Sequence, residues 1–376
     1  MTIQQQQFLE LLRSGLWGTP ADPNLFYGNV DWKSILRIAM EQTVQVIVAD
    51  GIETLPKEFW PPKEAIYKLM MVRMKTHQMN LLLNTTLKQI VDTLDFEGVP
   101  SVLLKGQGVA QNYINPESRM CGDIDLYVGL DGYDKACELI SKMDNDKHEG
   151  DEWEHHMHLK VNNVEVEVHR KVDHLLNKSQ DKHFQILSIH EIDHRFHTSY
   201  LNYWNNAGTI IKMPPTTFNV FFILHHAVRH MTKEGIGFRH ICDWVMYLHK
   251  HHHEIDNDKL SKYLKDFNME AVWNEFGQLA IEYMGLPSDN LPKPHTYHHS
   301  HRTKLLIKQI FISGNFGRYD ANGRDYSNAP YIKRKFRSFC FQTKRLCKLF
   351  QLFPYYIFNY GFGWFTTGIH AVLRSK

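Results

Sequence analysis

Two neighbouring stretches decide the fold of this chain: Leu-Lys-Gly-Gln-Gly at residues 104–108 and Arg-Met-Cys-Gly-Asp-Ile-Asp-Leu at residues 119–126. The first is typical of a buried strand that ends in a glycine turn, and the second of a strand that carries Asp123 and Asp125. Side chains two residues apart in a strand point to the same face. We therefore expect both carboxylates on one face of a sheet and Ile124 on the opposite, buried face.

Paired carboxylates at this spacing indicate a cation site. Two carboxylates a few ångströms apart repel each other unless a proton or a cation neutralises them. Their hard oxygen ligands favour Mg²⁺ or Mn²⁺. The alternative is a strand edge on which Asp123 and Asp125 are simply solvated. The turn at Gly106 favours the metal site, because a backbone without a Cβ can approach a phosphate group closely.

A third carboxylate is predicted from the stretch Val-Glu-Val-Glu-Val at residues 164–168, which alternates throughout and so places Glu165 and Glu167 on one face of a strand. If this strand lies beside the Asp-x-Asp strand, one of the two glutamates completes a site of three carboxylates. Glu167 is the favoured residue and Glu165 is its nearest rival. Such a site suits metal-assisted phosphoryl transfer, in which the protein supplies positioning and charge neutralisation.

Taken together, these motifs resemble the DNA-polymerase-beta-like nucleotidyltransferase superfamily, and they are especially similar to its group of uncharacterised bacterial nucleotidyltransferases. In that group the opening motif is L-K-G, the paired aspartates stand in R-x-x-G-D-I-D, and a third carboxylate precedes a histidine by two positions. The positions of this chain that match are Lys105, Gly106, Arg119, Gly122, Asp123, Asp125, Glu167 and His169. The motif-bearing part covers residues 100–170, and the segment at residues 235–244 resembles the C-terminal half of the group.

The resemblance implies an α+β fold in which a small mixed β-sheet nucleotidyltransferase core is flanked by N-terminal and C-terminal helical regions. It implies an enzyme that transfers a nucleoside monophosphate from an NTP to an acceptor, with Mg²⁺ (or Mn²⁺) as the cofactor. Asp123, Asp125 and Glu167 would be the catalytic residues and the metal ligands. The nucleotide-binding residues would be Lys105, Gly106, Gln107, Arg119 and Gly122.

Two positions depart from the superfamily pattern. The usual opening is Gly-Ser, whereas Gly106 is followed by Gln107, and the third carboxylate is often aspartate, whereas residue 167 is glutamate. A catalytically inactive protein that binds a nucleotide in the same pocket is therefore the alternative function. No motif identifies the acceptor, and the net charge of +2 does not favour a nucleic acid.

The composition indicates a reducing compartment. The five cysteines form no C-x-x-C pair, and the polar N-terminus has neither the charged nor the apolar region of a signal peptide. We therefore expect a cytoplasmic protein. Histidine is frequent, at 24 residues, but no histidine cluster has the Cys/His spacing of a structural zinc site or of an H-E-x-x-H helix, so zinc is disfavoured.

Hydrophobic periodicity and turn signals divide the chain into four regions: an N-terminal helical region at 1–97, the nucleotidyltransferase core at 98–213, a helical domain at 214–330 and a basic and aromatic tail at 331–376. Helices are predicted over 7–17, 32–49, 63–94, 108–113, 132–144, 218–231, 238–250, 258–267 and 271–284. Strands are predicted over 101–104, 123–128, 157–161, 164–169 and 209–213, with a two-residue hairpin turn at Asn162-Asn163.

The tail joins a basic cluster within residues 333–348 to a stretch, 349–373, that has no Asp, Glu, Lys or Arg and many aromatic residues. The interpretations, in order of preference, are a helix-bundle segment or protein interaction surface, an interfacial membrane contact and a bilayer span, which Pro354 and several glycines disfavour. A membrane-peripheral scaffold, for instance in surface-polysaccharide assembly, is therefore a further functional hypothesis.

Overall fold

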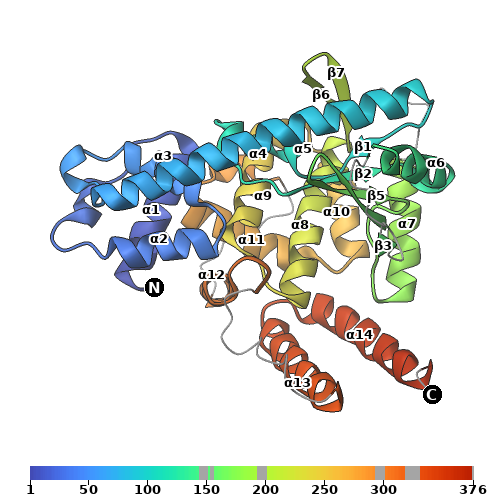
Figure 1. Ribbon diagram of the computed structural model, residues 1–376. Coiled ribbons are helices and arrows are strands. Elements are labelled where there is room, and N and C mark those ends of the chain that lie inside the picture. Colours follow the sequence, from blue (N-terminus) through green and yellow to red (C-terminus); the bar gives the residue numbers. More distant parts are fainter. Residues whose placement is uncertain (144–150, 153–155, 193–200, 293–300, 318–330, 375–376) are drawn as a thin grey trace. The chain divides into compact units, whose positions relative to one another are not determined.

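The computed structural model describes residues 1–143, 151–152, 156–192, 201–292, 301–317 and 331–374 (Figure 1). The chain divides into two compact units, one made of residues 1–72 and 220–376 and the other of residues 73–219. The fold is α+β, as the sequence predicts, because helices flank one small mixed sheet and a two-stranded sheet.

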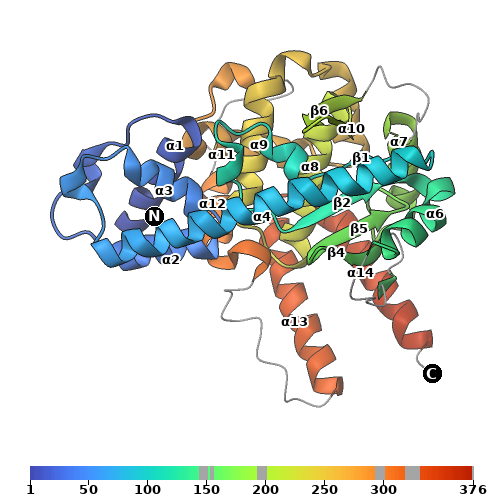
Figure 2. The same cartoon turned by 45° about the horizontal axis from the view of Figure 1, so that its top comes forward.

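The mixed sheet lies in the unit at 73–219 and has the strand order β1-β2-β5-β4-β3. Figure 2 shows β1, β2, β5 and β4 in that order. Strands β2 and β5 are parallel, and the other neighbouring pairs are antiparallel. The strands are β1 (Val102–Leu103), β2 (Asp123–Tyr127), β3 (Asp151–Glu152), β4 (His156–Val161) and β5 (Val164–His169).

One face of this sheet is aliphatic because every second residue of its central strands is apolar. Helices α4 (Lys63–Phe96) and α6 (Gly129–Ser141) supply the side chains that cover it, and the resulting core includes Ile124, Leu126, Val164, Val166, Val168, Leu159 and Val161. Burial of this face stabilises the fold by about 25 cal/mol for each Å² of apolar surface that is removed from water. The opposite face is thereby left to the polar residues of the same strands.

Two tight turns fix the registers of the two hairpins in this unit. Asn162 and Asn163, between β4 and β5, have φ values of 52° and 62°, which are the left-handed values that a type I′ turn requires. The predicted two-residue turn is thus confirmed. The second hairpin joins β6 (Asn202–Asn206), which the periodicity does not predict, to the predicted strand β7 (Thr209–Met213).

The remaining helices of the unit at 73–219 are short α5 (Gln107–Ala110) and α7 (Lys178–Ile192), and α8 (Thr216–Lys233) passes from this unit into the other. The sequence does not predict α7, because its apolar residues follow no clear helical stripe. The other unit contains α1 (Ile3–Trp17), α2 (Trp32–Glu41), α3 (Gln45–Glu53), α9 (Phe238–His251), α10 (Asn257–Asp266), α11 (Glu270–Met284), α12 (His301–Ser313), α13 (Tyr331–Phe350) and α14 (Pro354–Arg374).

The single helix predicted over 32–49 is wrong, because the structure has the two helices α2 and α3 there. Thr43 adopts a φ of 57° and ends the first helix. The physical reason is a tertiary contact. The buried side chain of Gln42 accepts a hydrogen bond from the backbone N–H of Phe238 at 3.0 Å and donates one to the carbonyl of Ile310 at 3.3 Å. Helix propensity carries no information about such a distant partner.

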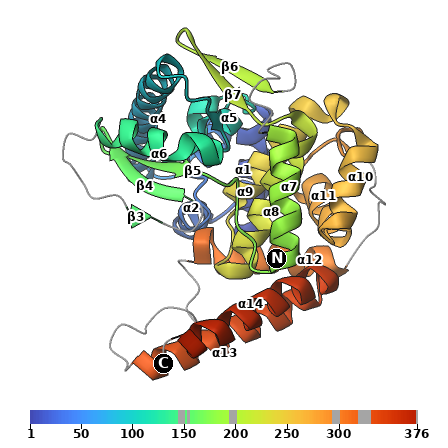
Figure 3. The same cartoon turned by 90° about the vertical axis from the view of Figure 1, so that its right-hand side faces the viewer.

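The C-terminal segment forms the two helices α13 and α14, which pack against each other (Figure 3). Phe339 of α13 stacks on Trp364 of α14, with ring centroids 5.1 Å apart. Among the described residues, no helix combines the length and the apolar character that crossing a bilayer demands.

Candidate active site

The polar face of the mixed sheet is a grid of nine side chains from three neighbouring strands. Because side chains alternate along a strand, the same face of β2, β5 and β4 carries every second residue of each. The strand register places these residues in three rows, which are Asp123–Glu165–Lys160, Asp125–Glu167–His158 and Tyr127–His169–His156. The acids of the first two rows thus face basic residues on β4.

Asp125 is the most deeply buried acid of the grid, with only 2% of its surface exposed. The ammonium of Lys105 lies 2.8 Å from Asp125 Oδ1, and His169 Nε2 lies 3.3 Å from the same oxygen. Burial alone would raise the pKa of Asp125, but the charge of Lys105 and the hydrogen bond from His169 outweigh it and hold that pKa well below its usual range. Asp125 is therefore a carboxylate at neutral pH.

The pKa values of Lys105 and His169, which both contact Asp125, are raised. Burial would lower the pKa of Lys105, but the carboxylates of Asp125, Glu167 and Asp123 outweigh it and raise that pKa. Burial would likewise lower the pKa of His169, but its hydrogen bonds to Asp125 and Glu167 raise it. The cluster therefore holds cationic groups against its acids before any metal or substrate arrives.

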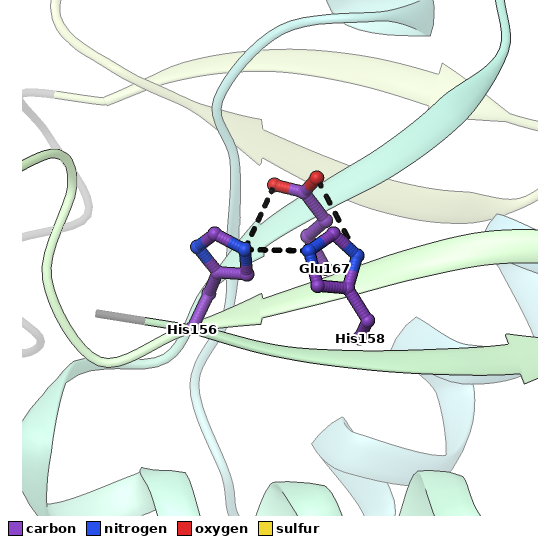
Figure 4. A group of neighbouring side chains, drawn as sticks. All are labelled: His156, His158 and Glu167. Carbon is purple, nitrogen blue, oxygen red and sulfur yellow. Dashed lines mark hydrogen bonds and ion pairs between the residues drawn. The ribbon is translucent and has the colours of Figure 1, made fainter. Parts of the chain in front are cut away.

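Glu167 is a half-buried carboxylate that three histidines surround. His169 Nε2 lies 3.1 Å from Glu167 Oε2, and His156 Nε2 lies 3.9 Å from the same atom. His158 Nδ1 lies 3.7 Å from Glu167 Oε1 (Figure 4). Burial opposes ionisation of Glu167, but the hydrogen bond from His169, together with the charges of Lys105 and His169, outweighs it and lowers the pKa of the carboxyl. Its rival Glu165 is exposed and stands in the first row, opposite Asp123.

The turn before α5 brings Lys105 to this face. Gly106 has a φ of 58°, and a Cβ at this position would lie 3.2 Å from the carbonyl oxygen of Asp123. Glycine thus permits both the left-handed backbone and the close approach to β2. The side chain of Gln107 is buried, and its Nε2 donates to Asn80 Oδ1 at 3.2 Å. The side chain that replaces the usual serine is therefore bonded within the protein.

Arg119 and Gly122 lie on the segment that enters β2. The guanidinium of Arg119 is buried and lies 2.7 Å from Cys121 Sγ, and the carbonyl of Arg119 accepts a hydrogen bond from Asn80 Nδ2 at 3.1 Å. A Cβ on Gly122 would meet open space. Asn80 of α4 thus contacts both motif-bearing segments, through Gln107 and Arg119, and fixes one against the other.

Two groups of possible metal ligands occur among the described residues, with the ligand atoms of each group within 4.8 Å of one another. One group is Asp125, Glu167 and His169, and the other is His156, His158 and Glu167. Glu167 belongs to both. Of the three carboxylates expected to hold a metal, the structure thus brings Asp125 and Glu167 into one group, whereas Asp123 lies one row away on the same face.

Sequence reasoning missed His156, His158 and Lys160 as residues of this face. The alternation was present in the sequence, because His158 and Lys160 lie on the predicted strand 157–161 and His156 immediately precedes it. The predicted two-residue turn at Asn162-Asn163 also implies the antiparallel register that sets His158 directly opposite Glu167. The histidine spacing does not match any zinc motif, because the third member of the group comes from a neighbouring strand.

His156 gives a pH-dependent signature of this face. Burial lowers its pKa from 6.5 to about 4. The unfolded chain binds the proton at a higher pH than the folded chain does. The free energy of unfolding should therefore have its full value above pH 6.5 and should decrease as the pH drops from 6.5 towards 4. Thermal unfolding across this range should show a smaller loss in His156→Gln than in the parent chain. A control variant of an exposed histidine, His253→Gln, should follow the parent. An imidazole of His156 that titrates in NMR spectra near pH 6.5 would contradict this prediction.

The fold and the site together indicate which class of protein this chain represents. A small mixed sheet with an Asp-x-Asp strand parallel to a Glu-x-His strand, beside a Lys-Gly turn, is the arrangement expected of a nucleotidyltransferase. The chain belongs to the family of uncharacterised nucleotidyltransferases, because the model of that family matches residues 28–285 of its 376 residues. The match spans the whole mixed sheet and continues to the end of α11. No curated protein and no solved structure gives a significant match to the chain.

Proposed function

We propose that this protein is a metal-dependent nucleotidyltransferase, which transfers a nucleoside monophosphate from an NTP to an acceptor hydroxyl or phosphate. The observation that carries the proposal is the pair Asp125 and Glu167, which stand opposite each other on parallel strands next to the ammonium of Lys105. Membership of the nucleotidyltransferase family supports the reaction class.

The donor set on this face fits a hard divalent cation. Asp123, Asp125 and Glu167 offer carboxylate oxygens on neighbouring strands of one face, which is the ligand chemistry that Mg²⁺ and Mn²⁺ prefer. When bound, the metal would lower the pKa of the attacking hydroxyl and neutralise phosphate charge. We assign these three residues as its ligands and as the catalytic carboxylates.

The chain's own groups supply positioning and charge. The ammonium of Lys105, which Asp125 already holds in place, would stabilise the negative charge that develops on the phosphates. The backbone around Gly106 can approach a phosphate closely, and Gln107, Arg119 and Gly122 complete the proposed nucleotide-binding segment. The acceptor oxygen attacks the α-phosphorus, its proton passes to Glu167, and the bond to the departing pyrophosphate breaks.

Transfer of label from an α-labelled NTP tests this proposal. The full chain is incubated with Mg²⁺ or Mn²⁺, each NTP in turn and fractionated cell lysate as the source of acceptors. We expect label to appear on an acceptor with release of pyrophosphate. Metal-dependent NTP binding in which no fraction is labelled would support the inactive nucleotide-binding alternative instead, and would contradict the transfer reaction.

The absence of disulfides between the described cysteines suits a cytoplasmic site of action, which we propose for this protein. Among the described residues, no disulfide joins any of the five cysteines, Cys121, Cys137, Cys242, Cys340 and Cys347. The thiol of exposed Cys347 is protected from oxidation in a reducing compartment.

The helices α13 and α14 favour a second function, a peripheral contact with an anionic membrane. An apolar groove of about 500 Å³ is lined by residues of both helices, among them Phe339, Phe350, Phe358 and Phe362. Exposed cationic side chains on α13 are Lys333, Arg337, Lys344 and Lys348, and residues 331–376 contain no Asp or Glu. Exposed aromatic rings beside basic groups suit the interface of an anionic bilayer.

Vesicle flotation tests the membrane contact. The triple variant Phe358→Ser, Phe362→Ser, Phe365→Ser should bind phosphatidylserine vesicles about 100-fold more weakly than the parent, since each ring that leaves the interface costs roughly 1 kcal/mol. A matched control replaces three exposed aromatic residues elsewhere, Tyr27, Tyr67 and Phe96, by serine and should bind like the parent. Equal flotation of all three proteins, or equal binding to neutral vesicles, would contradict this second function.

A further inference from the structure

Two histidines of β4 and one glutamate of β5 converge on one point of the polar face. His156 and His158 lie two residues apart on a strand, so their rings share a face, and Glu167 stands directly opposite His158 in the register. Figure 4 shows the three side chains directed toward one another. The Nε2 atoms of His156 and His158 are 2.8 Å apart, Glu167 Oε2 lies 3.9 Å from His156 Nε2, and Glu167 Oε1 lies 3.7 Å from His158 Nδ1.

With one ligand atom from each residue, all three atoms lie within 4.8 Å of one another. Ligand atoms held at about 2.0–2.2 Å from a tetrahedral ion lie about 3.3 Å from one another, so small side-chain rotations would bring this group to that spacing. Imidazole nitrogens suit Zn²⁺ and other first-row transition ions, whereas Mg²⁺ prefers oxygen ligands alone. Two histidines and one glutamate with an open fourth position form a donor set that zinc enzymes use.

The surroundings hold these ligands in place. His169 Nε2 lies 3.1 Å from Glu167 Oε2 and orients the carboxylate, whereas His158 Nδ1 lies nearest to the other oxygen, Oε1. Hydrogen bonds of this kind to ligand carboxylates strengthen metal binding. His156 is 8% exposed, and the residues that alternate with the ligands, Leu159 and Val166 among them, are anchored in the core. His158 is partly exposed, with 34% of its side-chain surface open, which leaves an access path for an ion.

On the β2 side of the polar face, where carboxylate oxygens predominate, the ammonium of Lys105 is already present as a cation. The ammonium of Lys105 lies against Asp125 at 2.8 Å, on the β2 side of Glu167, whereas His156 and His158 lie on the β4 side. From this geometry we infer that His156, His158 and Glu167 bind a divalent first-row transition-metal ion, Zn²⁺ in the first instance. The site shares Glu167 with the proposed nucleotidyltransferase centre, but ion binding there does not depend on the transfer reaction.

Metal titration of the full chain tests this site. The protein is stripped with a chelator and titrated with Zn²⁺ against a chromophoric competitor, and then with Co²⁺, whose visible spectrum reports nitrogen and oxygen ligands in a low-coordinate site. The double variant His156→Ala, His158→Ala should bind Zn²⁺ at least about 100-fold more weakly than the parent and lose the Co²⁺ spectrum. Equal affinity of the double variant and the parent would overturn the proposal.

A matched control is needed because the chain has 24 histidines. His252 and His253 are adjacent in the chain, lie outside the two ligand groups and have ring centroids 5.3 Å apart, with Glu254 3.5 Å from His253. The double variant His252→Ala, His253→Ala should keep the parent's affinity and its Co²⁺ spectrum. If instead this control loses the ion and the first double variant keeps it, the site lies elsewhere and the proposal is wrong.

Two further measurements distinguish the absence of the proposed Zn²⁺ site from a fold defect and from the absence of NTP transfer. Glu167→Gln keeps the shape of the side chain and should also weaken Zn²⁺ binding strongly, so a fold defect in the double histidine variant does not decide the outcome. Assays of NTP transfer with Mg²⁺ are run on the same proteins. Zn²⁺ binding without transfer in the parent would count against the proposed function alone, and transfer without Zn²⁺ binding would count against this site alone.

Discussion

Replacement of Asp125 by asparagine is expected to lower the rate of nucleotidyl transfer about a thousandfold. Asp125 is ionised and buried, it holds the ammonium of Lys105 at 2.8 Å, and it stands opposite Glu167 on the parallel strand. The amide has nearly the same shape but carries no charge, so it can neither position Lys105 nor hold a divalent cation as well. The loss should appear in the maximal rate at saturating NTP and Mg²⁺.

The matched control for this variant is Asp134→Asn, which neutralises an exposed acid on α6 of the same unit. It should retain the parent rate within about twofold, because a solvated surface charge has little effect on a buried site. A comparison of Glu167→Gln with Glu165→Gln then identifies the third carboxylate, and we expect the large loss in Glu167→Gln. An Asp125→Asn enzyme as active as Asp134→Asn would refute the assignment of Asp125.

Replacement of Lys105 by methionine is expected to destabilise the unit at 73–219 by about 3 kcal/mol at neutral pH. The substitution keeps an apolar chain of similar length but leaves Asp125, 2% exposed, without the ammonium that compensates its charge. Because the lowered pKa of Asp125 depends on Lys105, this pKa should rise in the variant. Urea unfolding followed by far-UV circular dichroism gives the change in stability.

The control for this prediction is Lys135→Met, which removes an exposed lysine that pairs with Glu97 at 3.1 Å in the same unit. An exposed pair contributes about 0–1 kcal/mol, so this variant should unfold close to the parent. Addition of Mg²⁺ should stabilise Lys105→Met more than the parent, since a bound cation replaces the lost ammonium. Equal unfolding midpoints for the two lysine variants would show that Lys105 does not compensate a buried charge.

Features with a local cause could be predicted from the sequence. The alternation at residues 123–128 and 164–169 predicts two strands with their acids on one face, and the structure pairs these strands in parallel. The turn at Asn162-Asn163 is also local, because asparagine tolerates the positive φ that the turn imposes. The long helix predicted over 63–94 is observed as α4, since its apolar stripe extends over many turns.

Features that depend on distant partners could not be predicted. The ammonium of Lys105 reaches Asp125 only because the turn at Gly106 passes over β2. The contact of Gln107 with Asn80 joins positions 27 residues apart. The break at Thr43 likewise depends on contacts of Gln42 with α9 and α12. None of these partners leaves a periodic signal in the sequence.

The central claim is that the polar face of the mixed sheet binds an NTP through a divalent metal. Calorimetric titration of the full chain with each NTP, in the presence of Mg²⁺, of Mn²⁺ and of chelator, tests it most directly. The account predicts saturable heat with at least one NTP, which requires the metal and is lost in the folded double variant Asp123→Asn, Asp125→Asn. The absence of binding to every NTP with either metal, or binding that the double variant retains, would contradict it.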